Sequence, residues 1–140
     1  RLGYAIGSEN TIEGLNRLKF SFNSYTIDRI SIEAGIESFK DNEYFEKTNA
    51  KIIQTREKTS EELKKLGFKV LNSSANFIFI SHNKIFASNL YKQLKENGVL
   101  VRYFAKDRID NYLRVTIGTN EEMRIFIEKL EKIIFQREKF

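Results

Sequence analysis

The stretch Asn111–Met123, NYLRVTIGTNEEM, sets the local fold in the second half of the chain. Its apolar residues alternate with polar ones in the two-residue period of a strand that buries one face. The apolar residues are Leu113, Val115 and Ile117. Arg114 stands at the centre of this strand, on the side opposite the apolar residues. The sequence therefore predicts a strand whose other face carries a cation at a fixed place.

A helix is expected directly after this strand. Thr119, followed three residues later by Glu122, forms a capping box. In this motif the threonine hydroxyl accepts from the glutamate amide, and the carboxylate reaches back to the threonine amide. The helix is thus predicted to begin at Asn120. A tight turn and a capped helix after the strand would hold Arg114 in one position.

A second arginine stands in a strand of the same kind. Arg102, in the run Val99–Phe104 (VLVRYF), is a single cation in an otherwise apolar strand, and only a short loop separates it from the strand of Arg114. Two guanidiniums on adjacent strands could meet and form an anion site, because each holds a carboxylate or phosphate through two hydrogen bonds. Burial of either one without a partner would cost roughly 3–5 kcal/mol. The alternative interpretation is a solvated sheet face that binds nothing.

Strand-like alternation and helical spacing take turns from Phe68 onward. Strands are expected at 68–71, 76–81, 99–104 and 112–118, and helices at 84–98 and from 120. This order predicts an α/β or α+β fold in which helices cover a sheet.

The first half of the chain is mostly helical in pattern. The run 1–7 (RLGYAIG) is expected to be a strand, and Ser8 is the expected cap of a short helix through Leu18. A loop is expected at 19–26. From about Ile27 to Gly67 the spacing is helical, with a weak interruption near Asp41 and Gly67 as the C-cap, which predicts a long connecting helix.

Composition limits the classes of function. The chain has 140 residues, 41% of them hydrophobic, no cysteine, one histidine and a net charge of +5. A lone His82, expected to lie in an exposed loop or beside a helix cap, cannot build a metal cluster, so no metal site is expected. No apolar run approaches a membrane span and no signal-peptide order is present, which predicts a soluble, cytoplasmic protein. The chain begins at Arg1 and its only methionine is Met123, so we expect a piece of a longer protein.

Several aromatic residues admit a nucleic-acid interpretation. They are Phe77, Phe79, Tyr103 and Phe104. A basic α/β module could stack bases on such side chains. However, the glycine spacing of RNA-binding strands is missing, and the alternation of Phe77–Ile80 (FIFI) is typical of a strand buried on both faces. The aromatic set is therefore expected to be core, and no nucleic-acid partner is expected.

Four motifs occur together in one order: RLGY at the start, SANFIFI after the long helix, then GVLVRYF and NYLRVTIGTNEEM. In order and spacing they resemble histidinol-phosphate aminotransferases, which are fold-type I enzymes dependent on pyridoxal phosphate (PLP). The resemblance covers the chain from Arg1 to about Ile134. It implies that the chain is the C-terminal portion of such an enzyme, with 1–40 a remnant of the large PLP-binding domain and the start of the connecting helices, and 41–140 the C-terminal small α/β domain.

The resemblance also implies roles for single residues. Arg1 matches the arginine that binds the PLP phosphate, and Arg114 matches the arginine that grips the substrate's α-carboxylate. Arg102 matches the arginine that holds the phosphate-bearing end of histidinol phosphate. Asn76 lies in a segment that lines the substrate region in relatives. The lysine that bonds to PLP lies upstream of the matching segment in relatives, so no catalytic residue is expected in this chain and the fragment alone should be inactive.

The implied parent reaction exchanges histidinol phosphate and 2-oxoglutarate for imidazole-acetol phosphate and glutamate, in histidine biosynthesis. Family relatives are homodimers, so a homodimer is expected, without a membrane partner. Two alternatives stay open. One is another class I or II PLP enzyme, acting on aromatic amino acids or related to phosphothreonine decarboxylases; the other is the basic α/β binding module.

Overall fold

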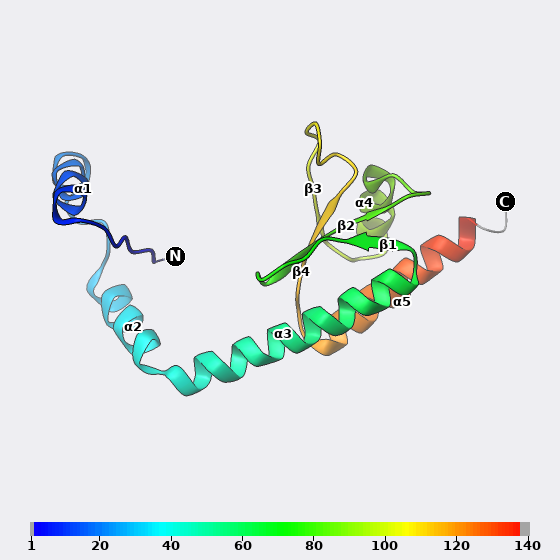
Figure 1. Cartoon of the computed structure of the whole chain (residues 1–140), viewed down its shortest axis with the longest axis horizontal. Helices are drawn as coiled ribbons and strands as arrows, with labels where there is room; N and C mark the ends of the chain where they lie inside the picture. The colour runs from blue at the N-terminus through cyan, green and yellow to red at the C-terminus, as the bar shows by residue number, and fades with distance from the viewer. Residues whose placement is uncertain (1, 138–140) are drawn as a thin grey trace. The chain divides into compact units, whose positions relative to one another are not determined.

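The computed structural model describes residues 2–137, with the side chains of residues 136 and 137 excepted (Figure 1). The chain divides into two compact units, with the boundary between Glu46 and Lys47. The units are described separately below. The assignment of 1–40 to a large PLP-binding domain stays a prediction.

The first unit consists of helices α1 (Glu9–Phe22) and α2 (Arg29–Lys40) and the start of α3 (Asn42–Lys65). Asp28 caps α2: its carboxylate accepts from the backbone N–H of Ser31 at 2.9 Å and from the Ser31 hydroxyl at 2.7 Å. These two bonds, the hydroxyl first, lower the pKa of the Asp28 carboxyl. The predicted interruption at Asp41 is confirmed, because α2 ends there and α3 begins at the next residue.

Two expectations for the first unit were wrong. The run 2–8 is not a strand, because among the described residues the only sheet begins at Phe68 and an isolated extended segment has no ladder to join. Helix α1 also continues four residues beyond Leu18 to Phe22. The added turn is supported by the Ser21 hydroxyl, which donates to the carbonyl of Arg17 at 2.8 Å.

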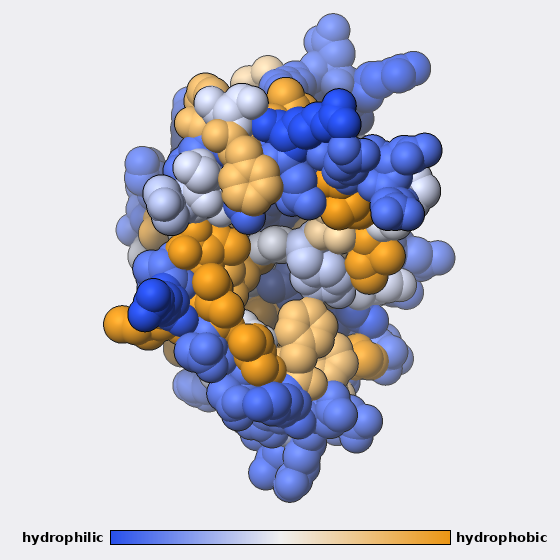
Figure 2. Space-filling view, turned by 90° about the vertical axis from the view of Figure 1, so that its left-hand side faces the viewer, coloured by the Kyte–Doolittle hydropathy of each residue, from blue (hydrophilic) through white to orange (hydrophobic). Residues whose placement is uncertain are grey.

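The first unit has no core of its own. No described residue up to Glu46 is buried, and large apolar side chains lie at the surface, as Figure 2 shows in orange among hydrophilic blue. Those most exposed include Tyr4, Ile6, Phe22, Tyr25 and Ile30. Leu2 also lies at the surface, whereas Ile12 is half-buried.

The second unit is built on one antiparallel sheet of four strands in the order β1-β2-β4-β3. The strands are β1 (Phe68–Val70), β2 (Phe77–His82), β3 (Arg102–Tyr103) and β4 (Leu113–Thr116). All four expected strands are present; β1, β3 and β4 are shorter than predicted, and β2 has the predicted length but lies one residue later in the chain. Gly67 ends α3 with φ +84°, which is the left-handed conformation that a glycine C-cap supplies.

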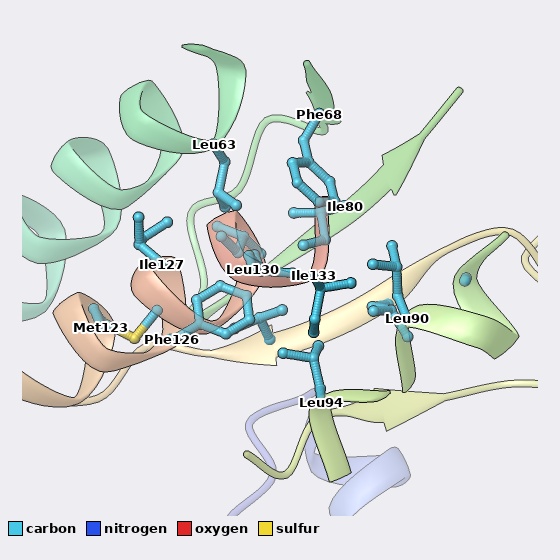
Figure 3. Close-up of a cluster of buried hydrophobic side chains, with 14 of the residues drawn as sticks. Leu63, Phe68, Ile80, Leu90, Leu94, Met123, Phe126, Ile127, Leu130 and Ile133 are labelled. Atoms are coloured by element: carbon cyan, nitrogen blue, oxygen red, sulfur yellow. The ribbon is translucent and has the colours of Figure 1, made fainter. Parts of the chain in front are cut away.

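Three helices share one hydrophobic core with the sheet: the later turns of α3, α4 (Ala87–Glu96) and α5 (Asn120–Arg137) (Figure 3). The sheet contributes alternate residues of β2 and β4 to this core, namely Ile78, Ile80, Leu113 and Val115. The helices contribute Leu63, Leu90, Leu94, Met123, Phe126, Ile127, Leu130 and Ile133. The predicted mixed α/β fold, with a sheet covered by helices, is confirmed, and the other residues of β2 and β4 form a second, more open face.

The described helices include none that combines the length and the apolar composition needed to span a membrane.

Candidate anion-binding site

Arg102 and Arg114 are direct partners across strands β3 and β4. Residues opposite each other in an antiparallel pair project from the same face of the sheet. Arg114 alternates with the buried Leu113 and Val115, so it lies on the face that the helices leave open. The predicted meeting of the two arginines on adjacent strands is therefore confirmed.

Both guanidiniums lie over one aromatic ring, that of Phe104. The central guanidinium carbon of Arg102 is 5.4 Å from the ring centroid, and that of Arg114 is 5.8 Å away. Arg114 also lies over the ring of Phe77, at 5.4 Å. These are distances at which a cation is attracted to the ring face. The two cations are thus held on an aromatic surface.

Neither arginine has an ion-pair partner in the part of the chain that the structure describes. Both side chains are exposed, so the cost of burying an unpaired charge does not arise here. Two unpaired guanidiniums on adjacent strands give this face a local positive charge. Such an arrangement suits a carboxylate or phosphate, which accepts two hydrogen bonds from each guanidinium fork.

A cleft of about 390 Å³ opens beside Arg114 on the same face. Its walls are mostly aromatic and apolar, and the loop before β2 adds polar groups. The residues that line the cleft are Leu71, Asn72, Ser73, Phe77, Phe79, Phe104, Ile109 and Arg114. A charged side chain at the edge of an apolar cleft is typical of small-molecule sites, where the few polar groups fix the ligand's orientation.

The expectation that Phe77 and Phe79 are core was wrong. Ile78 and Ile80 are 1% and 0% exposed, whereas Phe77 and Phe79 are half-buried on the open face of the sheet. At Phe77 and Phe79, therefore, β2 is buried on one side only. Tyr103 lies on the other side of the sheet from Phe104 and stacks on Tyr91 of α4, with ring centroids 5.9 Å apart. The four aromatic residues therefore do not form one continuous surface for stacking bases.

Asn76 immediately precedes β2. Its carbonyl accepts from the backbone N–H of Ile117 at 2.9 Å, and its side chain is exposed. No hydrogen bond within the described residues joins that side chain to Arg102 or Arg114. Arg56 of α3 holds the same loop, because its guanidinium donates to the carbonyl of Ala75 at 2.8 Å. Sequence reasoning missed Arg56, since nothing distinguishes it from the other charged residues of the long helix.

The predicted capping box after β4 is confirmed. The Glu122 carboxylate accepts from the backbone N–H of Thr119 at 2.7 Å and from its hydroxyl at 2.9 Å, and the Glu122 N–H donates to the hydroxyl oxygen at 3.3 Å. The backbone bond first, and then the hydroxyl bond, lower the pKa of the Glu122 carboxyl. The cap fixes the end of β4 and thereby the strand that carries Arg114.

His82 was expected to lie in an exposed loop or beside a helix cap, which was wrong. It ends β2 with only 7% of its surface exposed, opposite Phe68 of β1 in the sheet register. The two rings meet edge to face with centroids 4.9 Å apart, and Nδ1 accepts from the backbone N–H of Lys84 at 3.2 Å. His82 is therefore a packed residue of the sheet. The described residues contain no cluster of three or more metal-ligating side chains.

Arg1, the residue expected to bind the PLP phosphate, lies outside the described residues.

The chain is similar to aminotransferases over nearly its whole length. The sequence pattern of the family described as "Aminotransferase class I and II" matches residues 1–130. The histidinol-phosphate aminotransferase of Brachyspira hyodysenteriae is 64% identical over 134 residues, which make up 96% of this chain and 38% of that protein. The chain thus spans well under half the length of this relative.

Solved structures have the same fold. The histidinol-phosphate aminotransferase of Clostridium acetobutylicum superimposes with a TM-score of 0.81 at 25% identity, over 89% of this chain and 38% of that one. The histidinol-phosphate aminotransferase of Sinorhizobium meliloti, solved in complex with pyridoxal-5'-phosphate, gives a TM-score of 0.80 at 20% identity, over 91% of this chain and 34% of that one. With the family pattern matching residues 1–130, the chain belongs to the class I and II aminotransferases.

Proposed function

We propose that this chain is the C-terminal part of a PLP-dependent histidinol-phosphate aminotransferase and supplies its substrate-binding arginines. The parent reaction is the exchange of histidinol phosphate and 2-oxoglutarate for imidazole-acetol phosphate and glutamate in histidine biosynthesis. The observation that carries the proposal is the pair Arg102 and Arg114, which are register partners on an open sheet face and lack an acidic partner among the described residues. The 64% identity to a histidinol-phosphate aminotransferase supports the choice of substrate.

Arg114 holds the α-carboxylate of an amino-acid substrate, and Arg102 holds the phosphate of histidinol phosphate. A planar guanidinium fixes such an anion at two points and keeps its charge at any working pH. Asn76 borders the same substrate region. The gain from this arrangement is orientation, since a fixed anion places the reacting amine of the substrate in one position.

PLP is the cofactor that the family implies. Its chemistry is that of an electron sink, which stabilises negative charge next to the reacting carbon. The aromatic cleft and the unpaired arginines beside it fit a site for anionic, partly aromatic molecules. Within this chain only Arg1 is assigned to the cofactor, and the lysine that bonds to PLP is assigned to the part of the enzyme that relatives carry before the matching segment.

A chimera tests the proposal. This chain replaces the matching 134 residues of the Brachyspira hyodysenteriae enzyme, and aminotransfer from histidinol phosphate to 2-oxoglutarate is measured. Borohydride reduction followed by peptide mapping locates the lysine that carries the pyridoxyl group. We expect turnover near that of the parent enzyme and one modified lysine. A chimera that folds and takes up PLP but does not turn over histidinol phosphate would contradict the substrate assignment.

Arg102→Ala in the same chimera tests whether Arg102 binds the phosphate of histidinol phosphate. The loss of kcat/KM should be much larger for histidinol phosphate than for a non-phosphorylated amino acid such as phenylalanine. Equal losses would contradict the phosphate role and favour another PLP enzyme of the same family.

We further propose a cytoplasmic homodimer. The first unit supports an association of some kind, because its large apolar side chains lie at the surface and no described residue up to Glu46 is buried. The 140-residue chain by itself should therefore associate. Sizing chromatography with light scattering tests this expectation, and a strict monomer across micromolar concentrations would contradict it.

A further inference from the structure

We propose that Phe104 is a positioning residue whose ring sets the guanidiniums of Arg102 and Arg114 side by side, so that each is in place to bind a substrate anion. The inference rests on the proposed function, because it gives Phe104 a role only if the two arginines bind substrate anions. Phe104 directly follows β3, and the family resemblance implies no role for it.

The geometry singles out this ring among the aromatic residues of the open face. Phe104 is within 5.4 Å of the Arg102 guanidinium carbon and 5.8 Å of that of Arg114, measured from the ring centroid. Phe77 faces Arg114 alone. Among the described residues, Phe104 is thus the one ring that both cations share.

The charges explain why a shared ring matters. Arg102 and Arg114 are register partners, and like charges directly opposite each other on neighbouring strands repel. No carboxylate among the described residues pairs with either one. The negative face of an aromatic ring attracts both cations without neutralising them. Phe104 can therefore hold the two side chains in place while both stay free to bind an anion.

The ring is itself fixed. Phe104 is half-buried and packs at a tilt of 55° against Phe79, with centroids 6.4 Å apart. Phe79 in turn stacks on Tyr112, at 5.0 Å and 3°. The Phe104 carbonyl accepts from the backbone N–H of Lys106 at 2.9 Å, which ties down the residue's main chain. These contacts fix the position of the Phe104 ring, over which the two guanidiniums lie.

Two substitutions distinguish the effect of the aromatic ring from the effect of side-chain size. Phe104→Leu keeps an apolar side chain but removes the negative ring face, whereas Phe104→Tyr keeps the ring. Phe86→Leu is the control, because Phe86 is an exposed aromatic residue at the start of α4 whose ring no described guanidinium overlies.

The full 140-residue chain is titrated with inorganic phosphate at low ionic strength and pH 7.5, and the amide and arginine side-chain NMR signals are followed. Loss of two cation–π contacts should raise the dissociation constant of Phe104→Leu about three- to tenfold. Phe104→Tyr and Phe86→Leu should stay within about twofold of the wild type. Rescue by tyrosine is the result that a general packing defect would not give.

A Phe104→Leu variant that binds phosphate as the wild type does would overturn the inference and leave the proposed function intact. A failure of the proposed function would give a different result. Arg102→Gln and Arg114→Gln would then bind phosphate as well as the wild type, or the wild type would not bind phosphate at all. If Phe104→Leu loses its amide dispersion, Phe104→Met takes its place with the same expected weakening.

Discussion

Replacing Arg114 by glutamine is expected to lower kcat/KM of the chimera for glutamate, whose α-carboxylate Arg114 holds, by about 10²–10³-fold, which corresponds to roughly 3–4 kcal/mol of transition-state stabilisation. Glutamine keeps much of the length of arginine but loses the charge and the two parallel donors that grip a carboxylate. The substrate would still reach the aromatic cleft beside Phe77 and Phe104, but without a fixed orientation. Because orientation is the main contribution of such a contact, kcat should fall together with kcat/KM.

Arg124→Gln is the matched control for this experiment. Arg124 is an exposed arginine of α5 whose partners are Glu121 and Glu128 of the same helix. Exposed pairs of this kind contribute little to stability, so the control should keep the activity of the parent chimera. Arg114→Lys restores the charge without the fork and should recover only part of the loss. If Arg114→Gln lowered activity no more than Arg124→Gln, Arg114 would not be a substrate ligand.

Local patterns in the sequence were sufficient for the elements around the site. Alternation over Leu113–Ile117 predicted β4, and the capping box of Thr119 and Glu122 predicted the start of α5, because both signals act within a few residues. The convergence of Arg102 and Arg114 could also be predicted, since a short loop between two strands makes them neighbours.

Features that depend on register or on distant chain could not be predicted from the sequence in this way. Phe104 faces both arginines only because Arg102 pairs directly with Arg114, and a shift of one residue would move one of them to the other face. His82 is buried because β1 places Phe68 opposite it, which is a non-local contact. Phe77 and Phe79 have the alternation of a strand buried on both sides, but helices cover only one face of the sheet.

Leu113→Ala is expected to destabilise the second unit by about 2–5 kcal/mol. Leu113 is 0% exposed, and it pairs with Ile80 on one side of β4 and with Tyr103 on the other. Truncation leaves a cavity between two neighbouring strands and the helices above them, and a close-packed core collapses only partly into such a space. A domain of this size has a total stability of only about 5–15 kcal/mol, so the loss is a large share of it.

The loss of stability should appear in β2 and β4, the two central strands of the sheet. Native-state amide exchange across β2 and β4 of the full chain measures it directly, because the first unit has no buried residue among those described and should exchange early in any case. Leu100→Ala is the matched control: Leu100 is 81% exposed, and its truncation should change the free energy of opening by less than about 0.5 kcal/mol. Equal protection in the two variants would mean that β4 is not part of the cooperative core. The strand that carries Arg114 would then owe its position to the α5 cap alone, and an arginine on such a strand could not orient a substrate.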